Sequence, residues 1–440
     1  MDSKFYTGNR KALYSRLEED AIVIVCSGAA PRKTADEYYY YFADRNFMYL
    51  TGIDQCDATL LGYGSKSTPQ NAPQSGASVS AEGALAGASP AGASLKETLF
   101  IPPADPMWER WNGERVKAAA ASDLSGVVDI KHTQDFDRQL DFILGSGNYS
   151  TVYLPLFKYT ANEPDGKEYT LAKYIKDRYP HIIIKDLMPH VKALRLIKKP
   201  CEIEAMRKAE EITRAGILAM MQAAKPGISE LQLRAEFMYA IMKNGAATPA
   251  APPIISAGKN NFCIHYHDYK GIAQDGDMIL NDVGVPYNNI VTDVSRGWPV
   301  NGRFSDKQRW LYQCAYETSK HMFSIIKPGM PMKDVDGIIR KVNYEHLKAI
   351  GLCKTWDDVG KYMWHGGAHH VGFDVHDMVA IKPDTPLAAG MVFCVDIGIY
   401  VEEWGIGFRL EDNCLVTDDG CENLSKDIPS SIDDIEAVMK

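Results

Sequence analysis

The stretch DMILNDVGVPYNNIVTDVSRGWPV, residues 277–300, decides the fold of the second half of the chain. Two runs rich in apolar and β-branched residues flank the turn-prone PYNN of residues 286–289, a pattern that predicts an antiparallel hairpin. With four residues in the loop, the register sets Asp282 opposite Asp293. Opposed side chains lie roughly 4.5–5.5 Å apart at Cβ, so two like charges there repel each other. A divalent cation between the carboxylates would remove that cost.

A second hairpin repeats this pattern near the C-terminus. The runs AGMVFCVDIGIYV (residues 389–401) and IGFRLEDNCLV (residues 406–416) flank EEWG, which again gives a four-residue loop. Its register sets Asp396 opposite Glu411. The alternative is that the four acids of the two hairpins are solvent-facing members of half-buried strands. Two acid pairs at equal loop length favour the metal-binding interpretation.

Histidines gather between the two hairpins, in WHGGAHHVGFDVHD at residues 364–377. This segment holds four of the eleven histidines of the chain. A lone histidine is more often a packing residue than a ligand, but a cluster between two acid hairpins favours a ligand. Four carboxylates and one imidazole suit a pair of ions such as manganese, cobalt or zinc, held about 3.5–4 Å apart in known hydrolytic centres.

Composition limits the other function classes. The 440 residues are 45% apolar and 24% charged, with a net charge of −9 and a pI near 5.7, and no basic stripe indicates a nucleic-acid partner. Nine cysteines without a CxxC argue against a disulfide framework or a zinc knuckle. The charged N-terminus lacks the apolar core of a signal peptide, and no apolar run of about 18 residues is present to span a membrane. We therefore expect a cytoplasmic protein.

These motifs resemble those of the pita-bread metallopeptidases, in the aminopeptidase P and prolidase branch. The resemblance covers nearly the whole chain. In the second half it rests on SAGKNNFCIHYHD, NDVG followed by TDVSRGWPV, HGGAHHVGFDVHD and GFRLEDNCLVTDDGCENLS. In the first half it rests on RKTADEYYYYFADRNFMYLTGI and WERWNGERV, which are similar to the small α/β domain of aminopeptidase P.

The resemblance implies a site and an activity. The implied metal ligands are Asp282, Asp293, His369, Asp396 and Glu411. Asp293 and Glu411 would bridge two ions, with manganese as the first candidate and cobalt or zinc as the alternatives. His265 and His376 would orient the substrate and steady the tetrahedral intermediate, with His365 and Arg409 as supports. A bridging hydroxide would then attack the carbonyl before proline and release the first residue of the peptide.

One departure from the family pattern concerns a ligand. The family has glutamate followed by proline where this chain has Asp396 and Ile397. That glutamate is both a ligand and the proton carrier, and aspartate is shorter by one methylene, roughly 1.5 Å of reach. The leading hypothesis is an Xaa-Pro aminopeptidase. The alternatives are an Xaa-Pro dipeptidase (prolidase) and a pita-bread binding module with weakened catalysis, while a creatinase-type enzyme is disfavoured because that branch lacks the carboxylate set.

We expect two domains of the α/β (α+β) class. Residues 1–188 should form a small mixed α/β domain, and residues 189–440 a pita-bread catalytic domain with a curved antiparallel sheet. In the first domain the patterns predict a helix at 10–19 and strands at 21–28, 46–53, 58–63 and 97–103. Residues 65–95, rich in Ser, Gly, Ala and Pro, predict a disordered insertion. The resemblance also implies a homodimer or homotetramer.

Overall fold

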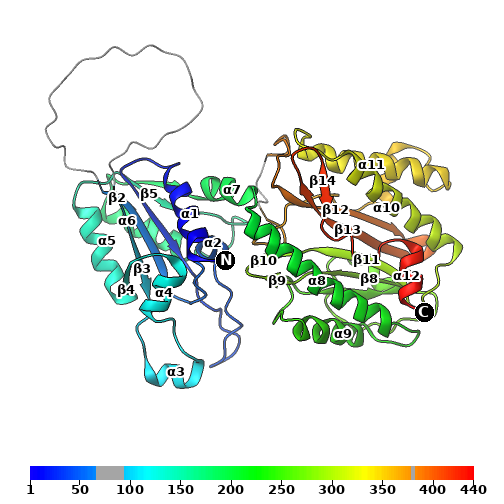
Figure 1. Ribbon diagram of the computed structural model, residues 1–440, viewed down its shortest axis with the longest axis horizontal. Helices are drawn as coiled ribbons and strands as arrows, with labels where there is room; N and C mark the ends of the chain where they lie inside the picture. The colour runs from blue at the N-terminus through cyan, green and yellow to red at the C-terminus, as the bar shows by residue number, and fades with distance from the viewer. Residues whose placement is uncertain (66–93, 378–381) are drawn as a thin grey trace, which may run out of the picture. The chain divides into compact units, whose positions relative to one another are not determined.

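The computed structural model describes residues 1–65, 94–377 and 382–440. Its contacts divide the chain into two compact units, Met1–Leu194 and Arg195–Lys440, which are coloured from blue to green and from green to red in Figure 1. The insertion predicted at 65–95 falls almost entirely on residues 66–93, which lie outside the described part. Among the described helices, none has both the length and the apolarity needed to cross a membrane.

The first unit is built on a six-stranded mixed sheet in the order β4-β3-β2-β1-β5-β6. The central strand β1 is apolar and buried along its whole length, as the sequence predicts. β2 and β3, which correspond to the strands predicted at 58–63 and 97–103, pair antiparallel, and the pairs β3–β4, β1–β5 and β5–β6 are parallel. The strands are β1 (Ala21–Cys26), β2 (Thr59–Ser65), β3 (Ser94–Ile101), β4 (Asp129–His132), β5 (Thr151–Leu154) and β6 (Ile183–Asp186).

The predicted strand at 46–53 is wrong, because this segment is the helix α2 (Arg45–Thr51). The Asp44 side chain accepts hydrogen bonds from the backbone N–H groups of Asn46 and Phe47, and Gly52 ends the helix with a left-handed φ of 70°. These two caps outweigh the β propensity of the aromatic residues between them. The first helix also begins and ends earlier than expected, as α1 (Ser3–Tyr14) with Asp2 at its N-cap.

The remaining helices of this half follow the strands. Between residues 143 and 187 a strand, a helix and a strand alternate as β5, α6 and β6. The helices are α3 (Pro106–Asn112), α4 (Ala118–Ser125), α5 (Phe136–Gly145), α6 (Lys167–Arg178) and α7 (Met188–Leu196).

The second unit is built on an antiparallel sheet in the order β12-β13-β11-β8-β7, with β14 paired to β13. Its strands are β7 (Ile254–Ala257), β8 (Met278–Val283), β11 (Val294–Pro299), β12 (Val392–Val401), β13 (Ile406–Val416) and β14 (Cys421–Asn423). A short ribbon of β9 (Pro286–Tyr287) and β10 (Ile290–Val291) caps the first hairpin.

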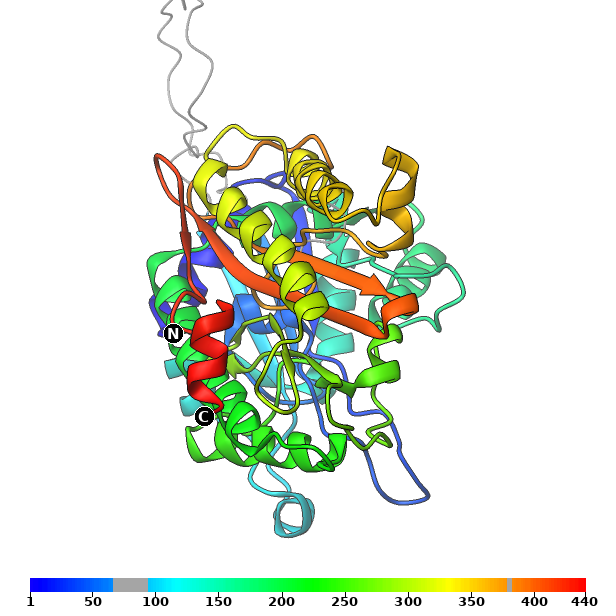
Figure 2. The same cartoon turned by 90° about the vertical axis from the view of Figure 1, so that its right-hand side faces the viewer.

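Helices cover this sheet and complete its core. α8 (Pro200–Ala223) begins with a proline in its first turn and packs against α9 (Glu230–Lys243). α10 (Asp306–Ile325) packs against both β12 and β13, and α11 (Met332–Ala349) packs against α10, as the yellow helices beside the orange strands show in Figure 2. The short helix α12 (Ile432–Val438) closes the chain. The sheet is thereby buried, and polar side chains on it need partners.

Candidate metal centre

The β12–β13 hairpin sets Asp396 opposite Glu411, as predicted. Every residue of both strands is buried, and the two acids are 7% and 2% exposed. A carboxylate removed from water in this way needs a compensating partner. Ser295 supplies one, since its Oγ lies 2.9 Å from Glu411 Oε2.

The register predicted for the first hairpin is wrong by two positions. Asp282 pairs with Ser295, not with Asp293. The cause is the turn, because Asn288 and Asn289 both adopt positive φ, 47° and 68°, and make a two-residue connection between β9 and β10. A slip of two residues keeps every side chain on the same face of the sheet. Asp282 and Asp293 are therefore diagonal neighbours on the two strands. The negative charge of Asp282 contributes to the raised pKa of Asp293.

The histidine segment lies along β12 as though it were a further strand. Backbone N–H groups of Cys394 and Asp396 donate to the carbonyls of His369 and Gly367, at 2.8 and 3.0 Å. This docking brings His369 to the acids. Its Nε2 lies 3.5 Å from Asp293 Oδ2 and 3.3 Å from Glu411 Oε1.

The acids at this point repel one another strongly. Burial raises the pKa of Asp293 well above its usual value, and the charges of Glu411 and Asp282 raise it further. Burial also raises the pKa of Glu411, with a second contribution from Asp396. At Asp282 burial acts in the same direction, but the charge of the Arg409 guanidinium, 2.9 Å away, and hydrogen bonds with Asp293 and Ser295 together lower the pKa. The directions of these pKa shifts agree with acids that lie close together.

The residues present fit a divalent ion. Asp293, His369, Cys394 and Glu411 each offer one donor atom, and these atoms lie within 4.8 Å of one another. Asp396 Oδ1 and Glu411 Oε1 are buried without a hydrogen-bond partner, although Glu411 Oε1 lies 3.3 Å from His369 Nε2. Unpartnered buried acceptors are costly, and a cation between them removes the cost.

His365 and Arg409 contact the acids from either side of the cluster. His365 Nδ1 lies 3.0 Å from Asp396 Oδ2. Burial lowers the pKa of His365, but the charge of Asp396 and their hydrogen bond outweigh it and raise the pKa to about 9. Tyr400 links the two supports, since its hydroxyl lies 3.1 Å from both His365 Nε2 and Arg409.

His265 and His376 lie at the exposed side of this cluster. Both are exposed, and the His376 ring lies 4.4 Å from the His369 ring between centroids. Burial lowers the pKa of His376, as do the charges of His369 and His265. All the predicted site residues are therefore neighbours, with two histidines facing solvent.

Three participants were not predicted. Ser295, Cys394 and Tyr400 contact the acids or their supports. Cys394 and Tyr400 stand two residues before and four residues after Asp396, so the two-residue period of a strand places them on its face. This alternation along the strand is the sequence signal that could have identified Cys394 and Tyr400. Ser295 could be found only with the correct register of the first hairpin.

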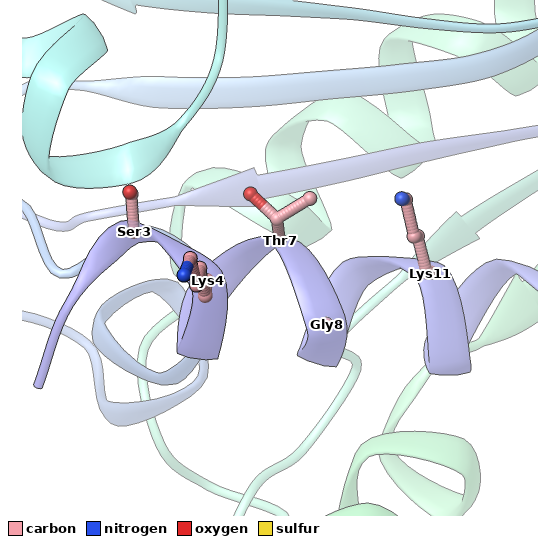
Figure 3. A pocket seen from close by; sticks show the side chains of 5 residues that line it. All are labelled: Ser3, Lys4, Thr7, Gly8 and Lys11. Carbon is pink, nitrogen blue, oxygen red and sulfur yellow. The ribbon is translucent and has the colours of Figure 1, made fainter.

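A separate hollow of about 260 Å³ lies on α1 in the first unit, as Figure 3 shows. It is lined by Ser3, Lys4, Thr7, Gly8 and Lys11. This lining contains no carboxylate, imidazole or thiol. The hollow therefore lacks the metal-ligand side chains that the acid and histidine cluster contains.

Comparisons with known proteins agree with this geometry. Residues 204–418 match the model of metallopeptidase family M24, and residues 6–153 match that of the aminopeptidase P N-terminal domain. A structure of a putative aminopeptidase P from Bacillus anthracis is 33% identical, with a TM-score of 0.91 over 100% of this chain and 98% of that chain. The chain belongs to metallopeptidase family M24.

Other relatives extend the likeness of this M24 member along its full length. Xaa-Pro aminopeptidase 3 of Mus musculus is 29% identical over 95% of this chain and 81% of that protein. Aminopeptidase P of Escherichia coli with the inhibitor Pro-Leu is 25% identical, with a TM-score of 0.87 over 100% of this chain and 98% of that chain. The expected pita-bread fold is thereby confirmed, and the protein is a metalloaminopeptidase, a hydrolase of peptide bonds that depends on divalent metal ions.

Proposed function

We propose that this M24 member removes the first residue from peptides that have proline in the second position. The convergence of Asp293, His369 and Glu411 in one buried cluster carries this proposal, because it offers the donors that peptide hydrolysis by metal ions requires. The match to an aminopeptidase P N-terminal domain favours an aminopeptidase over a dipeptidase. Relatives that bear the name Xaa-Pro aminopeptidase support the preference for proline.

Two divalent ions would be held by the five predicted ligands, Asp282, Asp293, His369, Asp396 and Glu411. Asp293 and Glu411 would be ligands of both ions. Each lies between other acids, whose charges raise its pKa. Manganese is the first candidate, with cobalt and zinc as alternatives. When bound, such ions polarise the scissile carbonyl and make water acidic enough to attack at neutral pH.

The side chains of the protein would move the protons and position the substrate. Asp396 and His365 form a buried ion pair that can hold a proton between Oδ2 and Nδ1. His376, whose ring lies 4.4 Å from the His369 ring between centroids, would donate a hydrogen bond to the substrate. His265 lies on the same exposed side and would act with it.

Metal content, measured together with peptide cleavage, distinguishes an aminopeptidase from a prolidase and from a binding module. We expect about two ions per chain and release of the first residue from Ala-Pro-Ala, with little release from Ala-Ala-Ala. Turnover of Ala-Pro alone would indicate a prolidase. If the protein neither binds ions nor cleaves these peptides, it is a binding module. The ion pair of Asp396 with His365 would then explain why Asp396 does not bind metal. Glu411→Gln is the inactive control.

Several further expectations stay proposals. We expect a cytoplasmic homodimer or homotetramer, although one relative, from Arabidopsis thaliana, is named as mitochondrial. The assignment of residues 1–188 to the N-terminal domain and of residues 189–440 to the catalytic domain is proposed on the same basis. The partner would be the peptide substrate, with no nucleic acid and no membrane.

A further inference from the structure

Cys394 lies at the metal centre although the activity does not require a thiol there. It stands on β12 two residues before Asp396, so both side chains point to the same face of the sheet. Its cross-strand partner is Asn413, two residues beyond Glu411 on β13. The cysteine side chain is fully buried.

The Cys394 sulfur makes long polar contacts. Its Sγ lies 3.6 Å from Asn413 Oδ1 and 3.9 Å from the Asp293 carbonyl oxygen. The same Sγ lies within 4.8 Å of donor atoms of Asp293, His369 and Glu411. In addition, Glu411 Oε1 is buried without a hydrogen-bond partner. Two buried ligand atoms with unmet bonding capacity therefore share one small space.

We propose that Cys394 binds, as a thiolate, the divalent ion that Asp293, His369 and Glu411 hold. This inference rests on the proposed dinuclear centre and adds a ligand to it. On binding, the S–H bond breaks, the sulfur lone pair forms the bond to the ion, and the proton leaves to solvent. No change of oxidation state is involved.

The thiolate changes which ion the site prefers. Carboxylate and water ligands alone suit manganese, whereas sulfur and imidazole favour zinc and cobalt. One sulfur, one nitrogen and two carboxylates make a donor set of the zinc type. The ion on the His369 side should therefore be zinc or cobalt in preference to manganese, while the ion nearer Asp282 keeps oxygen ligands only.

X-ray absorption at the zinc edge tests this proposal directly. Full-length protein loaded with two equivalents of zinc should show a sulfur scatterer at about 2.3 Å from the metal. Cys394→Thr replaces the thiol with a hydroxyl, places a residue that favours strands on β12 and should lose that scatterer. Cys263→Ser, which removes an exposed thiol two residues from His265, should retain it and so excludes zinc bound at the surface.

A competition titration gives a second readout. The ratio of zinc affinity to manganese affinity should fall by about tenfold or more in Cys394→Thr, since even outer-shell changes alter metal affinity 10–100-fold. If that variant fails to fold, the wild-type spectrum alone decides. Bound zinc and peptide cleavage with only nitrogen and oxygen scatterers would overturn the thiolate ligand and leave the proposed function intact. Failure to bind any ion would overturn both.

Discussion

Asp396 and Glu411 face each other across the β12–β13 hairpin, and each keeps one buried carboxylate oxygen without a hydrogen-bond partner. In an apolar sheet such a pair is unfavourable, because both groups lose water and gain a like charge. A cation shared with His369 converts the same geometry into an attraction. We therefore expect the second unit to depend on a bound cation for part of its stability.

Adding a divalent ion should raise the Tm of the metal-free protein. At about 100 times its Kd, an ion that binds only the folded state contributes about 2.7 kcal/mol, which corresponds to about 5–10 °C for a domain of this size. Glu411→Gln should abolish the increase. Glu422→Gln, which alters a partly exposed acid paired with Arg207, should preserve it. An equal increase in both variants, measured by scanning calorimetry, would refute a role for Glu411.

Asp396→Asn should lower kcat by about 100-fold or more on a tripeptide with proline second. The amide keeps the shape of the side chain but can neither hold a proton nor pair with protonated His365. Asp396→Glu restores the residue that the family has, and it should maintain or raise kcat. A complete loss in this second variant would show instead that the pocket has adapted to aspartate.

Asp377 should be needed to hold the histidine segment in place. Its two oxygens contact Arg195 at 2.5 Å and Lys198 at 3.2 Å, and all three side chains are at most 3% exposed. Its backbone N–H also donates to the His370 carbonyl. Removing one member of such a network leaves buried charge uncompensated, at a cost of about 3–5 kcal/mol.

The test is Asp377→Asn, with Asp384→Asn as a control at an exposed ion pair with Lys333. We expect a large decrease in Tm for the first variant only. We also expect kcat to fall, because the adjacent His376 loses its support. An Asp377→Asn protein with unchanged Tm and kcat would contradict this role.

Glu210 should make the stability of metal-free protein depend on pH. It is buried on α8, and Asn413 and Ser425 donate to its Oε1 at 2.7 and 3.0 Å. Burial raises its pKa from 4.5 to about 7, and Asp412 adds to the shift while Arg296 opposes it. The folded state thus binds the proton more tightly than the unfolded state. Its contribution to stability is complete below about pH 4.5 and is lost as the pH rises through 7.

Glu210→Gln should remove this pH dependence. Between pH 4.5 and 8, the free energy of unfolding of wild type should fall by up to about 3 kcal/mol more than that of the variant. Thermal melts with chelator at several pH values provide the measurement. Parallel pH profiles for the two proteins would show that Glu210 has an ordinary pKa.

The second hairpin could be predicted fully from sequence, whereas the first could not. Alternating residues and a four-residue loop place Asp396 opposite Glu411, and the structure agrees. In the first hairpin, Asn288 and Asn289 tolerate positive φ and shorten the loop to two residues, a choice that PYNN leaves open. The error did not displace the acids from their face, because the slip was an even number of residues.

Other parts of the structure depend on contacts that local patterns do not contain. The strand predicted at 46–53 failed because Asp44 and Gly52 cap a helix around aromatic residues that favour strands. The position of His369 required the docking of its segment along β12, which no local pattern reports. The presence of Cys394 among the donors follows from strand alternation once the metal centre is located.

Anomalous diffraction from crystals grown with zinc would locate the metal ions in the protein. We expect two peaks, about 3.5–4 Å apart, within the cluster formed by Asp282, Asp293, His369, Asp396 and Glu411. A map without peaks there, or with zinc only at surface residues, would contradict this expectation.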